Sequence, residues 1–181
     1  MNMILNKKTS GGFTLIELMV TISIIGILTA VIFASFDQAR QQSRDKVRKA
    51  DLKLLQLAVE SYRAQNDQYP AQGCGTAGSD FAGPGGGGSG FADCPDYIAG
   101  LVPDFIPELP TDPIFEDVSG QGFFYSSDGV SYKIIVLDSV EVDEVTSFDH
   151  EFARCPTSSC SEALADINKT YGVYSVGAQD W

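Results

Sequence analysis

The chain has 181 residues, of which 44% are hydrophobic and 20% charged, and its formal net charge is −12 at pH 7. This length suits one domain with its own core and hardly allows two. From residue 67 onward the sequence has 19 acidic and three basic residues, whereas residues 37–66 have four acidic and seven basic ones. Because nucleic-acid binding depends on Lys and Arg that displace counterions, the acidic C-terminal part is not expected to bind nucleic acid.

A long apolar run, FTLIELMVTISIIGILTAVIFASF, covers residues 13–36, and Glu17 is its only charged residue. The run is long enough to cross a bilayer as a helix, which takes ~20 mostly apolar residues. Lys7 and Lys8 precede it, and basic residues tend to keep the adjoining end of a membrane helix in the cytoplasm. We therefore expect a single-pass membrane segment, with its amino end in the cytoplasm and residues 37–181 outside.

An ordinary secretory signal peptide, cleaved near residues 30–35, is the alternative interpretation of the same run. The run is longer than the usual apolar region of such signals, and it contains an acidic residue. Under this alternative the chain is an exported or membrane-anchored binding protein that does not polymerise.

The segment GGFTLIEL at residues 11–18 resembles the class III signal of type IV pilins and type II secretion pseudopilins. The shared features are a short basic leader, a Gly directly before Phe, and FTLIEL at the start of an apolar helix. The resemblance implies that residues 1–12 are a leader, which a prepilin peptidase removes by cutting between Gly12 and Phe13. It also implies that the new amino group of Phe13 is methylated, and that Glu17 is the family's acidic residue in the first helical turn.

The carboxylate of Glu17 would lie one helical turn from the positive amine that cleavage leaves on Phe13. An unpaired charge in lipid is costly, roughly 2.5–3.5 kcal/mol even on the most lenient scale. We therefore expect Glu17 to pair with the Phe13 amine of a neighbouring subunit and to set the register of assembly. The alternatives are that Glu17 reaches the lipid headgroups or pairs with its own amine. The apolar residues of this turn that would pack against neighbouring subunits are Leu15, Ile16 and Leu18.

Residues 37–66 predict an amphipathic helix that continues the apolar one, because no Gly or Pro occurs before Pro70. We expect this stem to present one face to the head. The residues that recur at three- and four-residue steps and predict that face are Val47, Ala50, Leu54, Leu57, Ala58 and Ser61, with Tyr62 alongside.

Residues 67–181 predict an acidic globular head. Its Gly-rich segment 73–90 is expected to be a mobile surface loop without helix or strand. Strands are expected at 122–126 and 131–137, joined by a turn at Asp128-Gly129, and a third at 171–176. The predicted fold class is α+β, and the resemblance implies the pilin fold, in which a long N-terminal helix packs against a small antiparallel sheet.

All four cysteines lie after the apolar run, which favours disulfides in an oxidising compartment over zinc ligation. Three pairings are open; we favour the local one, Cys74 with Cys94 and Cys155 with Cys160. We expect no cofactor, although the resemblance allows a calcium site that uses Asp112 or Asp180. The one histidine, His150, lies in an acidic stretch where an exposed ion pair is expected, and no catalytic arrangement is recognisable.

These observations predict a structural subunit, not an enzyme, that polymerises through its N-terminal helix into a type IV pilus or a similar filament. A type II secretion pseudopilin is the alternative within the family. The resemblance implies three kinds of partner besides the subunit itself: the prepilin peptidase, an inner-membrane platform protein and an assembly ATPase. It also implies a precursor in the inner membrane and an assembled filament at the cell surface or in the periplasm.

Overall fold

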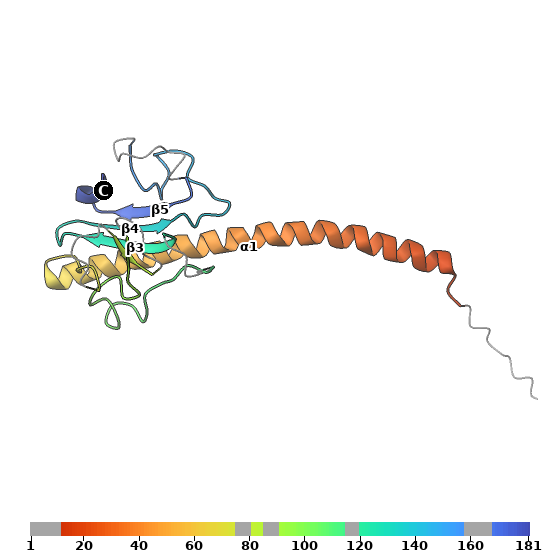
Figure 1. The fold of residues 1–181 in the computed structure, drawn as a ribbon, viewed down its shortest axis with the longest axis horizontal. Helices are drawn as coiled ribbons and strands as arrows, with labels where there is room; N and C mark the ends of the chain where they lie inside the picture. The colour runs from red at the N-terminus through yellow and green to blue at the C-terminus, as the bar shows by residue number, and fades with distance from the viewer. Residues whose placement is uncertain (1–11, 75–80, 85–90, 115–119, 158–167) are drawn as a thin grey trace, which may run out of the picture. The chain divides into compact units, whose positions relative to one another are not determined.

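The computed structural model describes residues 12–74, 81–84, 91–114, 120–157 and 168–181. The chain divides into two compact units, Met1–Ala39 and Arg40–Trp181, called here the N-terminal unit and the head unit. Helix α1, Leu15–Asn66, contributes residues to both units (Figure 1). It ends at the predicted residue, where the amide of Asp67 donates to the carbonyl of Arg63 and Asp67 takes a positive φ of 59°. Such a left-handed residue is a common way to end a helix.

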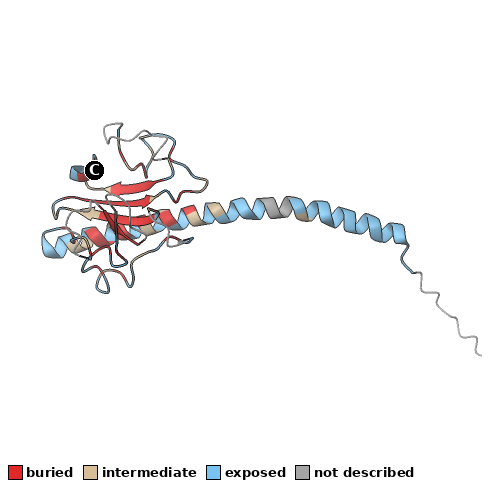
Figure 2. Cartoon of the chain, viewed as in Figure 1, coloured by how far each residue is buried: buried red, intermediate tan, exposed pale blue. Residues whose placement is uncertain are grey.

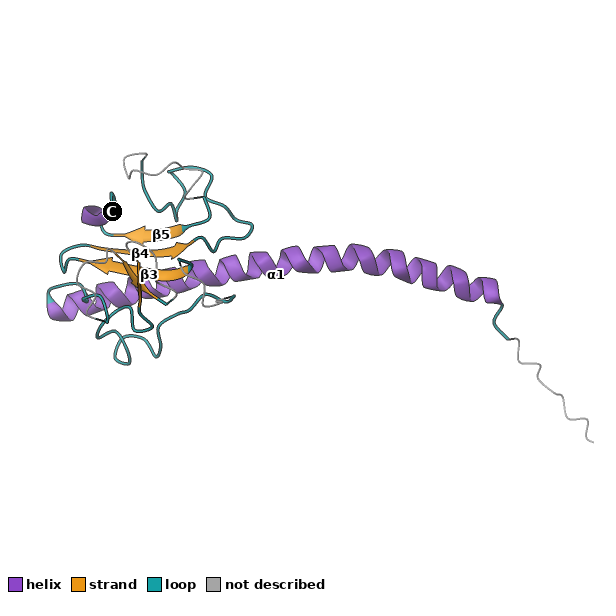
Figure 3. Cartoon of the chain, viewed as in Figure 1, coloured by secondary structure: helices purple, strands orange, loops and turns teal. Residues whose placement is uncertain are grey.

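The head unit contains a five-stranded sheet in the order β2-β1-β3-β4-β5. Figure 3 labels three neighbouring strands of this sheet, β3, β4 and β5. Strands β1, β3, β4 and β5 pair antiparallel, and β2 adds to β1 in parallel. The fold is therefore the predicted α+β arrangement of a long helix and a small sheet, extended by one parallel edge strand. The strands are β1 Phe81–Gly83, β2 Phe91–Asp93, β3 Gly122–Ser127, β4 Tyr132–Leu137 and β5 Tyr171–Tyr174, and the 3-10 helix η1, Val176–Ala178, follows β5.

The prediction that residues 73–90 contain no strand is wrong for β1. Phe81 and Ala82 are buried, so this short apolar stretch gains contacts that offset the entropy cost of its Gly-rich surroundings. Gly83 is required by a close backbone approach, because a Cβ there would lie 2.0 Å from the carbonyl oxygen of Phe123. The remaining residues of the segment, 75–80 and 85–90, lie outside the described residues.

The hairpin between β3 and β4 has a four-residue connection, 128–131, rather than the predicted two-residue turn. Asp128 Oδ1 accepts hydrogen bonds from the amides of Val130 (2.8 Å) and Ser131 (2.6 Å). These bonds lower the pKa of the Asp128 carboxyl, since they favour its charged form. Gly129 supplies the positive φ of 85° that the turn needs.

The face of α1 that packs on the sheet agrees with the predicted one only in part: Ala58 is buried and Tyr62 packs against the core, but most of the other predicted residues face solvent. Val47, Leu54 and Leu57 are 43, 45 and 67% exposed, whereas Leu52 and Leu55 are fully buried. Figure 2 shows buried and exposed residues alternating along the part of α1 that lies in the head unit. The prediction failed because charged residues occupy the first turns of the buried face, as described below. The side chains that form the main core with the sheet include Leu52, Leu55, Ala58, Val59, Phe123, Tyr125, Tyr132, Ile134, Val136 and Tyr171.

The two leucines Leu55 and Leu57 provide a direct test of this helix orientation. We expect Leu55→Ala to lower the free energy of unfolding of the head by about 2–5 kcal/mol, because it leaves a cavity in the core. Leu57→Ala should change it by less than about 0.5 kcal/mol, the range of surface substitutions. Chemical denaturation of the detergent-solubilised full chain measures both values. Equal losses would contradict the orientation of α1.

One of the two favoured disulfide pairs is present. Cys74 and Cys94 form a disulfide, with Cα atoms 5.8 Å apart. It joins the end of the loop that follows α1 to the residue after β2, and the Cys94 amide also donates to the carbonyl of Gly83. Cys155 is buried and disulfide-bonded, and Cys160 lies outside the described residues.

Candidate processing and assembly segment

The N-terminal unit exposes nearly all of its described apolar side chains. Phe13 is 88% exposed, Leu15 75%, Ile16 69% and Leu18 59%, and no part of the most apolar window of α1 is buried within the protein. In the described part of the chain, α1 is the one helix long and apolar enough to cross a membrane. These side chains therefore need lipid or other subunits to cover them.

The polar side chains of this segment are satisfied by the helix itself. The hydroxyls of Thr21, Ser23 and Thr29 donate to backbone carbonyls three or four residues earlier, at 2.7–2.8 Å. In lipid no water is available to hydrogen-bond a polar side chain, so these bonds within the helix lower the free-energy cost of burying the hydroxyls there. Glu17 thus remains the only group in the segment whose charge needs a further explanation.

The carboxylate of Glu17 is held by Thr14, the residue that precedes the helix. Glu17 Oε2 accepts hydrogen bonds from the Thr14 amide (2.8 Å) and hydroxyl (2.7 Å), and the Glu17 amide donates back to the Thr14 hydroxyl (3.3 Å). This reciprocal arrangement is a capping box. Sequence reasoning missed Thr14, although the spacing Thr-x-x-Glu before an apolar run is a recognisable signal for it.

The predicted cleavage site lies immediately before this capped turn. Gly12 is exposed, and a Cβ built on it would meet no described atom within 4 Å. Packing in the described residues therefore does not explain why position 12 is a glycine. Gly12 and Phe13 lie outside any helix or strand. This stretch is therefore accessible to a protease that binds its substrate in an extended conformation.

A second group of functional residues fastens the connection between β4 and β5 to α1. Arg48 is fully buried, and its Nε and Nη2 donate to the two carboxylate oxygens of Asp112 at 2.7 and 2.9 Å. Its Nη1 donates to Asp45 (2.7 Å) and to Glu141 (3.0 Å), which also pairs with Arg44. These contacts raise the pKa of the Arg48 guanidinium although burial opposes its charge. We call Arg44, Asp45, Arg48, Asp112 and Glu141 the ionic cluster.

Asp45 also accepts hydrogen bonds from three consecutive backbone amides. Those of Glu141, Val142 and Asp143 donate to its carboxylate at 3.1, 2.9 and 3.0 Å. Burial of Asp45 opposes its charge, but these bonds and Arg48 lower the pKa of its carboxyl. The hydrogen bond from Arg44 has the largest effect on Glu141 and lowers the pKa of its carboxyl. Burial raises this pKa, but by less. The acids of this connection therefore bind the basic side of the helix within one chain.

The possible calcium site at Asp112 is not supported. Both carboxylate oxygens of Asp112 accept from Arg48, and Oδ1 also accepts from the amide of Ile114. Among the described residues, no group of three or more His, Cys, Asp or Glu is placed to hold a metal ion. His150 accepts a hydrogen bond from the Phe152 amide and stacks on the ring of Tyr171, whereas an exposed ion pair was predicted.

A capped, exposed apolar helix in one unit and an α+β head in the other define a pilin-like protein. Residues 7–33 match the prokaryotic N-terminal methylation motif. The chain is 34% identical over 67 residues to the type II secretion system core protein G of Pseudomonas aeruginosa, covering 37% of this chain and 47% of that protein. It is 41% identical over 58 residues to the type IV major pilin protein PilA of Myxococcus xanthus, covering 32 and 26%.

A third relative is the competence protein ComGC of Halalkalibacterium halodurans, 39% identical over 59 residues, which cover 33% of this chain and 58% of ComGC. The matched segments thus span less than two thirds of each relative's own length. No solved structure matches the chain. The chain thus carries the methylation motif and is distantly homologous to type IV pilins, type II secretion core proteins G and a competence protein.

Proposed function

We propose that the chain is the precursor of a filament subunit of the type IV pilus kind. A prepilin peptidase cuts it between Gly12 and Phe13, the amine of Phe13 is methylated, and the subunit leaves the inner membrane for a filament at the cell surface or in the periplasm. The observation that carries the proposal is the capped Glu17 at the start of an apolar helix that its own chain leaves uncovered. Such a helix is stable in lipid as a precursor and equally stable among neighbouring helices.

The proposed assembly step gives the Glu17 carboxylate a second partner. In the single chain Glu17 accepts from Thr14, and in the filament its free lone pairs accept from the Phe13 amine of a neighbouring subunit. Leu15, Ile16 and Leu18 pass from lipid to protein contacts at the same time. An inner-membrane platform protein and an ATPase would supply the work of extraction.

Mass spectrometry of the protein recovered from its native cell envelope tests the processing. We expect a chain that begins at N-methylated Phe13, because the methylation motif covers residues 7–33 and Gly12 is exposed. A chain that begins near residue 35, or still at Met1, would contradict the proposal and return the protein to the exported or anchored class.

A pseudopilin of a type II secretion system is the second candidate, favoured by the similarity to core protein G. The two candidates differ in what a deletion strain loses. Loss of long filaments from the sheared fraction of the cells supports the pilus. Retained filaments together with loss of a secreted protein from the medium support the pseudopilin.

A further inference from the structure

We propose that the solvent-facing side of α1 in the head unit binds the same side of a second, parallel copy of this chain, with lysines of one copy opposite acids of the other. The proposal rests on the proposed function, since a filament supplies the second copy, and it adds which residues of the head unit form the contact. The surface has three parts: an apolar seam, an acidic edge and a lysine edge.

The apolar seam consists of Val47, Ala50, Leu54 and Leu57. Their spacing of three, four and three residues puts them in one row on the helix, opposite the buried face. All four are exposed, and Leu57 is two-thirds exposed. Single exposed apolar residues need no explanation, but a continuous row on one helix face is the pattern of a helix that packs against another helix.

The acidic edge lies along one side of the seam, where the loop 104–111 runs beside α1. Leu54 and Asp51 line a groove of about 420 Å³ together with Pro107, Glu108 and Pro110 of this loop. The loop is held in place because the Tyr97 hydroxyl donates to the Pro110 carbonyl at 2.9 Å. Within the described part of the chain, no ion pair neutralises Asp51, Asp104 or Glu108. A rigid acidic groove of this kind favours a cationic partner.

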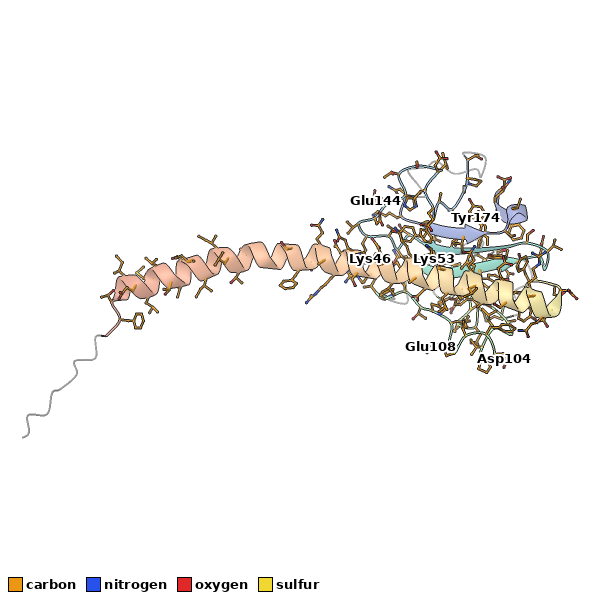
Figure 4. All side chains as sticks on the ribbon, turned by 180° about the vertical axis from the view of Figure 1, so that it is seen from behind. Lys46, Lys53, Asp104, Glu108, Glu144 and Tyr174 are labelled. Atoms are coloured by element: carbon orange, nitrogen blue, oxygen red, sulfur yellow. A yellow bond between two sulfur atoms is a disulfide. The ribbon has the colours of Figure 1, made fainter. Side chains whose placement is uncertain are left out.

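The lysine edge lies on the other side of the seam and consists of Lys46 and Lys53. Figure 4 shows both lysines on α1, and Asp104 and Glu108 on the loop beside it. Lys46 is exposed and forms no ion pair with a described residue. Lys53 pairs with Glu151, but both side chains are more than half exposed, at 58 and 68%, so this surface pair is easily exchanged. Arg44 and Arg48 are already engaged in the ionic cluster.

The order of the charges selects the orientation of the second copy. When two such helices run parallel, either face to face or side by side, the lysine edge of one lies opposite the acidic edge of the other. When they run antiparallel, lysines face lysines and acids face acids, and like charges at an interface are strongly unfavourable. The chain is therefore complementary to a parallel copy of itself. Side by side, with the lysine edge of one copy against the acidic edge of the next, the contact can repeat from subunit to subunit, as a filament requires.

Charge reversal in cells that express the full chain tests the contact. We expect Lys46→Glu and Glu108→Lys each to reduce the filaments recovered from sheared cells roughly tenfold, and the double variant to restore them. Asp149→Lys is the matched control, because Asp149 is exposed and far in sequence from both edges. The melting temperature of each variant in detergent should stay that of the wild type, which separates a lost contact from a lost fold.

Two outcomes would overturn the proposal: single reversals that behave like Asp149→Lys, or a double variant that is no better than either single one. The second outcome would indicate that a different protein occupies the acidic groove. Both differ from failure of the proposed function, in which the chain is not cleaved at Gly12 and the wild type forms no filament. Co-expression of Lys46→Cys and Glu108→Cys chains adds a direct measurement, since parallel copies should form disulfide-linked dimers within the sheared filaments.

Discussion

Glu17→Ala is expected to abolish filaments while cleavage between Gly12 and Phe13 continues. In the proposed processing, the peptidase recognises the exposed Gly12-Phe13 bond, which the substitution does not change. Assembly, in contrast, brings the charged amine of Phe13 into an apolar environment, where an unpaired charge costs at least a few kcal/mol. Without the Glu17 carboxylate the amine has no partner. The readouts are the sheared filament fraction and the mass of the membrane-bound chain.

The capping box provides the controls for this prediction. Glu17 also caps α1 through Thr14, so the alanine variant loses a helix cap of about 1 kcal/mol as well as a charge. Thr14→Ala removes the side-chain half of the cap and keeps the carboxylate, and Glu17→Gln keeps the hydrogen bonding and removes the charge. If charge pairing drives assembly, Glu17→Gln fails and Thr14→Ala assembles. The reverse result would assign Glu17 to capping alone, and normal filaments in Glu17→Ala would refute the pairing.

The sequence predicts much of the fold because its signals are local. The end of α1 at Asn66 follows from an unbroken helical stretch before Pro70, and β3, β4 and β5 lie within a few residues of their expected positions. Each of these elements is bounded by Gly, Pro or a polar turn residue, which restricts the backbone directly. The N-terminal motif can be recognised for the same reason, since the predicted leader, the predicted cleavage site and the start of α1 are adjacent in the chain.

The orientation of α1 could not be predicted from apolar spacing alone. Leu54 and Leu57 are exposed while Arg48 and Asp45 are buried, which reverses the usual expectation for these residue types. The burial of Arg48 depends on Asp112 and Glu141, which lie 64 and 93 residues away. A pairing over such a separation leaves no trace in the helix sequence, and only the folded chain reveals it. The apolar seam could be predicted as one helix face, but the sequence assigned that face to the head, whereas the folded chain leaves it exposed.

Arg48→Met is expected to be the most destabilising single change in the head. Methionine fills the space of the aliphatic stem, but Asp45 and Asp112 then remain buried without their cation. Breaking a buried ion pair by removing one partner typically costs about 3–5 kcal/mol. Arg40→Met is the matched control, because Arg40 is exposed and makes no ion pair with a described residue. Denaturant unfolding of the full chain in detergent at pH 7 measures both losses.

The pH dependence of the same experiment distinguishes lost charge pairing from lost packing. The pKa values of Asp45 and Glu141 are lowered in the folded chain, so their contribution to stability is present above their ordinary values, about 4, and is lost as the pH falls through the lowered ones. The wild type should therefore lose stability below about pH 4. In Arg48→Met the guanidinium no longer stabilises the charged form of these carboxylates. The difference in free energy of unfolding between wild type and variant should therefore become smaller as the pH falls through that range. If the difference in free energy of unfolding between wild type and variant stays constant from pH 7 to pH 3, Arg48 acts through its packing. The ionic cluster would then not be what holds the β4–β5 connection on α1.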